Sequence, residues 1–149
     1  MEDPAPAFPV IVMVASAGGI QALCHIFGAF PADLQAAVAV VQHRGPRAGS
    51  RLAHVLNRCS LLPVRDAVAG ERVQPGRIVL APANHHLLVQ PDGRFALSNA
   101  ARVRSLRPAA DVLFASVAPV FTTRVIAVVL TGGDNEVGGV PLQGLWEVP

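Results

Sequence analysis

The sequence predicts an α/β domain with three layers, in which a doubly wound, mostly parallel sheet carries a peripheral antiparallel hairpin. Three segments of seven residues each, 9–15, 36–42 and 124–130, are almost continuously apolar and rich in valine. Such runs are typical of strands that are covered on both faces. Apolar residues at helical spacing separate the first two runs, and an Asp-Gly turn divides two short strand-like segments farther along.

Composition predicts one domain. The chain has 149 residues, of which 52% are hydrophobic and 15% are charged, against about 25% charged residues in an average soluble domain. Residues 1–8 are expected to be a short disordered lead, and residues 9–149 the domain itself, with a C-terminal part that is atypical or truncated after about residue 136. The formal net charge is +2, and the basic residues are all arginines scattered along the chain. This balance does not indicate a nucleic-acid partner.

No apolar run reaches the ~18–20 residues that span a bilayer, and the N-terminus lacks a basic, cleavable leader. We therefore expect a cytoplasmic protein without direct membrane insertion. Cys24 and Cys59 lie in predicted helices with neither CxxC spacing nor a neighbouring His/Cys set. Both are expected to be buried thiols, without a disulfide or a zinc site.

The first half of the chain predicts a βαβ unit. A strand at 9–15 is followed by a helix at about 18–30 and a strand at 36–42. Pro31 ends the helix. The apolar face of this helix consists of Ile20, Leu23, Phe27 and Phe30.

The second half predicts a helix at 50–59, a short strand at 63–67 and another strand at 77–81. Strands at 86–90 and 94–98 flank Pro91-Asp92-Gly93 as a hairpin. A helix then begins near Pro108, and the strand at 124–130 follows it. The buried face of this last helix is expected to carry Val112, Leu113 and Val117.

Polar residues follow the three long strands. Ser16 comes after the first strand, His43 after the second, and Asp134, Asn135 and Glu136 follow the third. Because ligand sites in parallel α/β sheets lie beyond the carboxyl ends of the strands, these residues are expected at one edge. They are the residue types of a nucleophile, a general base and an acid that orients the base.

Each of these residues also has a structural interpretation. Ser16 is a favoured helix N-cap residue, and a histidine at a strand end is often structural. Catalysis is supported by the glycines of the loop, since Gly18 and Gly19 allow a substrate carbonyl close to free N–H groups that could hold an oxyanion. A phosphate or carboxylate bound at this helix N-terminus is an alternative.

No cofactor is expected. The S-A-G-G loop lacks the G-x-G-x-x-G dinucleotide pattern, and the absence of lysine excludes a P-loop. No metal site is expected either, because Asn84, His85 and His86 have no further ligand at suitable spacing.

Two sets of arginines could face an acidic partner or could simply be solvated. One set is Arg102, Arg104 and Arg107, and the other is Arg44, Arg47 and Arg51, which lie near the expected active edge.

Five blocks, in order, resemble the catalytic domain of chemotaxis protein-glutamate methylesterases, and the resemblance runs from about residue 9 to residue 135. The blocks are VASAGGIQAL (14–23), VVQHR (40–44), GERVQPGRIVLAPANHHL (70–87), RPAADVLFASVA (107–118) and AVVLTGG (127–133).

The resemblance implies hydrolysis of glutamate γ-methyl esters on methyl-accepting chemotaxis receptors, at their acidic cytoplasmic helices. Ser16 corresponds to the nucleophile and His43 to the general base. The acid position falls on Glu136, with Asp134 as the alternative acid. Backbone amides of the glycine-rich loops are expected to hold the oxyanion and the substrate, at Ala17, Gly18, Gly19 and Gly133.

The chain departs from the family pattern in two places. Glu136 stands where the family has aspartate, and a misplacement of about 1 Å can cost ~100-fold in rate. After Gly139 the chain ends as VPLQGLWEVP, without the family's closing helix and strand. We expect an uncovered face on the third core strand, with lower stability or a compensating partner.

Three functional hypotheses follow. The first is the methylesterase itself, regulated by a separate receiver-domain protein because no receiver domain precedes residue 9. The second is a catalytically weak or inactive homologue that acts as a receptor-binding or signalling-protein-binding module. The third is a serine esterase without a receptor substrate.

Overall fold

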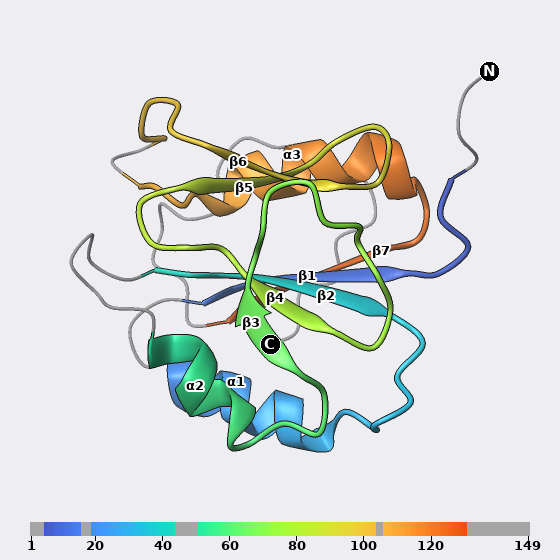
Figure 1. Ribbon diagram of the computed structural model, residues 1–149, viewed down its shortest axis with the longest axis vertical. Coiled ribbons are helices and arrows are strands. Elements are labelled where there is room, and N and C mark those ends of the chain that lie inside the picture. The colour runs from blue at the N-terminus through green and yellow to red at the C-terminus, as the bar shows by residue number, and fades with distance from the viewer. Residues whose placement is uncertain (1–4, 16–18, 44–50, 104–105, 131–149) are drawn as a thin grey trace.

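The chain folds around a five-stranded parallel sheet with strand order β3-β4-β2-β1-β7 (Figure 1). The computed structural model describes residues 5–15, 19–43, 51–103 and 106–130. A separate antiparallel pair, β5 and β6, lies beside α3. The elements are β1 (Val10–Ala15), α1 (Gly19–Ala29), β2 (Ala37–Gln42), α2 (Arg51–Asn57), β3 (Val64–Asp66), β4 (Ile78–Leu80), β5 (His86–Val89), β6 (Phe95–Ser98), α3 (Ala110–Phe121) and β7 (Val125–Leu130).

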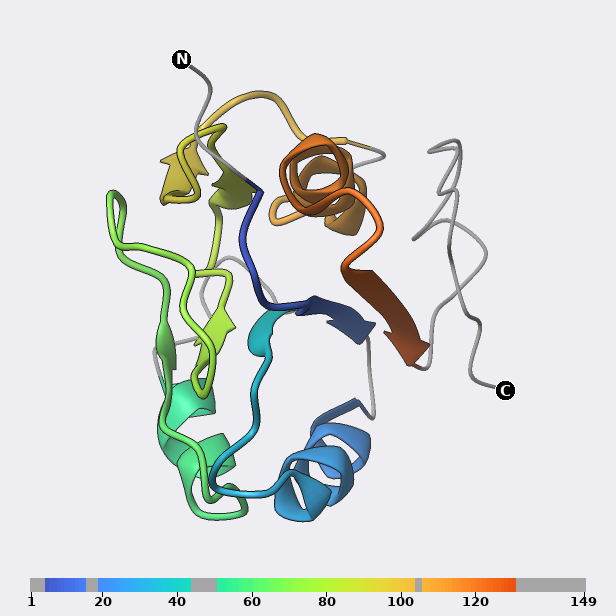
Figure 2. The ribbon, with the colours of Figure 1, turned by 90° about the vertical axis from the view of Figure 1, so that its right-hand side faces the viewer.

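Helices cover both faces of this sheet. Figure 2 shows α3 and the β5–β6 pair on one face and α1 with α2 on the other. Successive strand residues point to opposite faces, so β1 contributes Val12 to the first layer and Met13 to the second. The first layer packs around Phe114 of α3, and the second around Phe27 of α1. The predicted doubly wound architecture is confirmed.

The strands β1 and β2 form the centre of the sheet because they are apolar at nearly every position. All six residues of β2 are buried, as are five of the six in β1. The strand β1 pairs in parallel with β2 and with β7, and the three strands end at the same level. Ala15 lies opposite Gln42 on one side and opposite Leu130 on the other. The carboxyl ends of β2, β1 and β7 therefore meet at one edge.

The predicted elements are observed, with small changes at their boundaries. The second helix ends at Asn57 rather than Cys59. The side chain of Asn57 explains the connection that follows, since its Oδ1 accepts from the Val64 N–H at 2.8 Å and its Nδ2 donates to the Val64 carbonyl at 2.7 Å. The end of α2 is thereby joined to the start of β3.

The hairpin is antiparallel, as predicted, and pairs Leu88 with Ala96. It packs on α3, where the Ser116 hydroxyl accepts a hydrogen bond from the Val89 N–H at 2.9 Å. The segment before β1 reaches the same helix, because the ring of Phe8 packs edge-on against Phe121 at 5.8 Å.

The expectation that the two cysteines are separate thiols is wrong. Cys24 and Cys59 are joined in a disulfide, with their Cα atoms 5.3 Å apart, instead of being separate thiols. A spacing of 35 residues gives no local signal for such a bond. The pairing arises because α1 and the turn after α2 pack on the same face of the sheet, which brings the two side chains together.

The outer strand β7 is less covered than its neighbours. It pairs with β1 on one side, its residues are mostly half-buried, and Ile126 is 42% exposed. The expectation of an uncovered face on this strand concerned the tail and stays a prediction. The altered tail after Gly139 lies outside the described residues. Within the described ranges no helix combines the length and the apolar character that crossing a bilayer requires.

Candidate active site

His43 is the one residue of the expected triad that the described ranges include, and it stands directly after β2. Its backbone N–H donates to the Ala15 carbonyl at 2.9 Å. The neighbouring Gln42 is 6% exposed, and its Nε2 donates to the His43 carbonyl at 3.2 Å. His43 is itself half-buried. The position of this histidine is therefore fixed by the central strands rather than by a loop.

The segments with the other two expected groups continue from the ends of β1 and β7. Ser16 is bonded to Ala15, and the segment that carries the acids is bonded to Leu130. Ala15 and Leu130 are paired neighbours, and His43 hydrogen-bonds to Ala15. The structure thus brings the carboxyl ends of β1, β2 and β7 to one edge.

Several expected site residues lie outside the described part of the chain. They are Ser16, Ala17, Gly18, Gly133, Asp134 and Glu136, together with Arg44, Arg47 and Arg104. Gly19 is described, and it is the buried first residue of α1. The N-terminus of this 11-residue helix therefore begins at the same edge as His43.

The other histidines do not compete for the role of base. His25 and His54 are exposed on α1 and α2. The Nδ1 of His85 lies 2.9 Å from the Ala83 carbonyl. His86 is 1% exposed, and both of its ring nitrogens have partners. Its Nδ1 accepts from the Ala109 N–H at 3.2 Å, which leaves Nε2 to donate to the Ala101 carbonyl at 3.0 Å.

The role of His86 is structural, since it joins β5 to the start of α3. The sequence placed Asn84, His85 and His86 together as a weak candidate for metal binding. In the described ranges no three His, Cys, Asp or Glu side chains gather as a metal-ligand group.

A polar cluster near the same edge was not predicted. The guanidinium of Arg107 donates to Asn84 Oδ1 from Nη2 at 2.8 Å and from Nε at 3.1 Å. Asn84 has φ of +63°, a left-handed conformation that asparagine tolerates better than most residues. The arginines were noticed in the sequence, but hydrophobic periodicity carries no signal that pairs Arg107 with Asn84.

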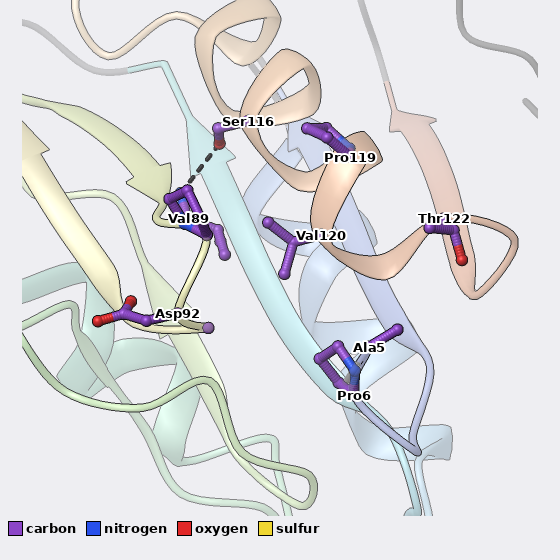
Figure 3. Close-up of a pocket in the computed structure, with 10 residues that line it drawn as sticks. Ala5, Pro6, Val89, Asp92, Ser116, Pro119, Val120 and Thr122 are labelled. Carbon is purple, nitrogen blue, oxygen red and sulfur yellow. Dashed lines mark hydrogen bonds between the residues drawn. The ribbon is translucent and has the colours of Figure 1, made fainter. Parts of the chain in front are cut away.

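A cavity of about 780 Å³ opens at the other end of the molecule (Figure 3). It lies between the segment before β1, the β5–β6 turn and the last turn of α3, and its described lining is mainly apolar. Asp92 is the ionisable side chain among those lining residues, and the Ser116 hydroxyl is engaged by Val89. The cavity therefore brings together no nucleophile and base.

The chain is similar in sequence and in structure to known proteins. The family model described as CheB methylesterase matches residues 11–138. A solved structure, the Thermotoga maritima CheB methylesterase catalytic domain, superimposes with a TM-score of 0.82 and 32% identity. This match covers 88% of the present chain and 71% of that one.

Curated relatives bear related names. The chain is 43% identical over 123 residues to a protein-glutamate methylesterase/protein-glutamine glutaminase of Symbiobacterium thermophilum, covering 83% of this chain and 34% of that protein. It is 33% identical over 129 residues to a putative enzyme of the same name from Leptospira interrogans, with 87% and 67% covered. The chain thus spans about a third of the first relative and two thirds of the second.

Proposed function

Since the chain belongs to the CheB methylesterase family, we propose that it is a protein-glutamate methylesterase that hydrolyses glutamate γ-methyl esters with a serine, a histidine and an acid. The single observation that supports this most is the hydrogen bond between His43 and Ala15. It joins the residue bonded to Ser16 to the histidine itself, on two buried strands.

In the proposed reaction His43 accepts the proton of the Ser16 hydroxyl while the Ser16 oxygen attacks the ester carbonyl. Backbone N–H groups of the loop at Ala17, Gly18 and Gly19, with Gly133, hold the negative oxygen of the tetrahedral intermediate. As the intermediate collapses, the bond to the methoxy group breaks and this group takes the proton from His43, so that it leaves as methanol. Water, deprotonated by His43, then cleaves the acyl-enzyme and releases a free glutamate carboxylate.

The third member of the triad is proposed to be Glu136, with Asp134 as its competitor. An acid beside the imidazole selects the tautomer and stabilises the imidazolium that forms during attack. Glu136 carries the same charge as the family's aspartate on a side chain one methylene longer. Neither a cofactor nor a metal ion is needed for this chemistry.

The proposed substrates are methyl-accepting chemotaxis receptors, at the acidic helices that these receptors carry in the cytoplasm. A cytoplasmic location follows from that substrate. Arg51, exposed in the first turn of α2, and the neighbouring Arg44 and Arg47 are candidates for meeting the receptor.

Release of methanol from a methylated receptor fragment tests the proposal. The unmodified chain is expected to release methanol, and Ser16→Ala to lose at least about 10³-fold in kcat. Ser60→Ala is the matched control, because the Ser60 hydroxyl bonds locally to the backbone of Leu62, in the connection that leads to the amino end of β3. Equal rates for the unmodified chain and Ser16→Ala would remove the enzymatic function and favour a binding module. Turnover of small esters without turnover of the receptor would favour a general esterase.

A second activity is supported by the names of two relatives, which include protein-glutamine glutaminase. The same acyl-enzyme forms when the leaving group is ammonia instead of methanol. Ammonia release from a receptor fragment with glutamine at the methylation position measures this activity. Loss of both activities in Ser16→Ala is expected if one site performs them.

A further inference from the structure

An arginine cluster at the active edge, Arg102 and Arg107, forms no ion pair with an acid of the described ranges. Arg107 is fully engaged, since besides Asn84 it donates from Nη1 to the Asn99 and Ala100 carbonyls at 3.1 and 3.3 Å. Arg102 is exposed and approaches the same Asn84 Oδ1 from its Nη2 at 3.4 Å. Two guanidinium groups therefore converge on one neutral oxygen.

In this cluster two guanidinium groups surround a neutral amide oxygen instead of a carboxylate. The ion pairs between described residues are Arg65 with Glu71 and Arg94 with Asp92, so two other arginines have carboxylate partners. Within the same ranges neither Arg102 nor Arg107 meets a carboxylate. A guanidinium prefers a carboxylate to a neutral amide oxygen, because the charged bond is roughly twice as strong.

The cluster lies at the edge that carries His43. Val40 is paired with Leu80, and the Val40 carbonyl accepts the Ala81 N–H at 2.9 Å, so the segment after β4 that holds Asn84 leaves the sheet at the edge of His43. The connection from β6 to α3 supplies Arg102 and Arg107 on the α3 side of the sheet (Figure 1). When the ester of an extended or helical substrate reaches His43, the side chains next to the ester in that substrate would lie over the segment between β6 and α3.

We propose that Arg102 determines specificity by binding a free carboxylate that lies beside the methyl ester in an acidic helical substrate. The inference rests on the proposed function and names a substrate feature for it. Arg107 positions Asn84 and the surrounding backbone, while Arg102 has a guanidinium face left for the substrate. Release of the weak contact to Asn84 costs little, because a 3.4 Å contact lies beyond the ordinary range of such bonds.

The test compares two receptor fragments that carry one methylated glutamate. The first fragment keeps acidic residues around the ester, and the second has glutamine in their place. Arg102→Ala is expected to lower kcat/KM on the acidic fragment about threefold to fivefold, the range of an exposed ion pair, and to leave the glutamine fragment within twofold. In about 1 M salt the electrostatic screening length falls to about 3 Å. The difference between the effects of Arg102→Ala on the two fragments should then disappear.

Arg77→Ala is the matched control, since Arg77 is an exposed arginine before β4, at the opposite edge. It should treat the two fragments alike. Arg102→Lys should retain part of the preference, because it keeps the charge but loses the two-pronged geometry. An equal effect of Arg102→Ala on both fragments, or no effect, would overturn the inference.

A binding measurement separates this inference from the proposed function. Fluorescence anisotropy of both labelled fragments is measured with the unmodified chain and with Arg102→Ala. If no methanol is released, the proposed enzymatic function is wrong. The carboxylate site is still supported if the unmodified chain binds the acidic fragment more tightly than the glutamine fragment and Arg102→Ala abolishes this preference. Equal affinities for both fragments would refute it.

Discussion

The backbone N–H of His43 donates to the Ala15 carbonyl at 2.9 Å, one residue beyond the last paired positions of two buried parallel strands. Both residues are therefore held by the rigid centre of the sheet. The active edge depends on this register, because a shift of one residue along a strand would turn every side chain to the opposite face.

Replacing His43 with glutamine should abolish the methylesterase activity while the fold is retained. An amide cannot accept the proton of Ser16, and loss of a triad member costs about 10³-fold or more in kcat. Methanol release and thermal unfolding measure the two properties. His25→Gln is the control, since His25 is exposed on α1, and its rate should be unchanged. A His43→Gln protein with more than a tenth of the original rate would contradict the role of base.

The two acids are distinguished by single replacements. Glu136→Gln should lower kcat by about 10³- to 10⁴-fold if Glu136 orients the imidazole, because an amide in that position favours the wrong tautomer. Asp134→Asn should then change the rate less than about threefold. The reverse order of effects would assign the role to Asp134. Glu136→Asp is informative as well, since a faster enzyme would show that the extra methylene limits catalysis.

Replacing His86 with leucine should destabilise the protein strongly. The change removes two hydrogen bonds in a site that is 1% exposed and leaves the N–H of Ala109 without its acceptor. We expect a loss of about 2–4 kcal/mol in the free energy of unfolding, measured by urea denaturation. His54→Leu is the control at an exposed helix position. A loss below 1 kcal/mol for His86→Leu would argue against the structural role.

Reduction of the disulfide should lower stability without removing the active edge. Cys24 and Cys59 are 35 residues apart, and a link of this length contributes about 2–4 kcal/mol by restricting the unfolded chain. In the denatured protein a thiol reagent should label no cysteine before reduction and two cysteines after it. Cys24→Ser should be as stable with reductant as without. Two labelled thiols before reduction would show that the bond is not formed.

Much of the architecture was predictable because it depends on local patterns. The continuous apolar runs of β1, β2 and β7 predicted parallel strands covered on both faces, which holds for β1 and β2, while β7 is mostly half-buried. The Asp92-Gly93 turn predicted the hairpin. The expected placement of His43 follows from the same patterns, since the residue after a core strand must emerge at its carboxyl end. The identity of the chemistry came from the order of the sequence blocks, because each short motif by itself has a structural interpretation.

The sequence by itself determined which residues form the strands and which residues follow them, since hydrophobic periodicity is a property of neighbouring positions. Only the tertiary structure decided that Cys24 meets Cys59, that His86 bonds to α3, and that Arg107 joins Asn84 beside an exposed Arg102. These contacts join residues 23 to 35 positions apart. They depend on how helices and loops pack on the sheet, and a pairing that packing creates leaves no periodic trace in the chain.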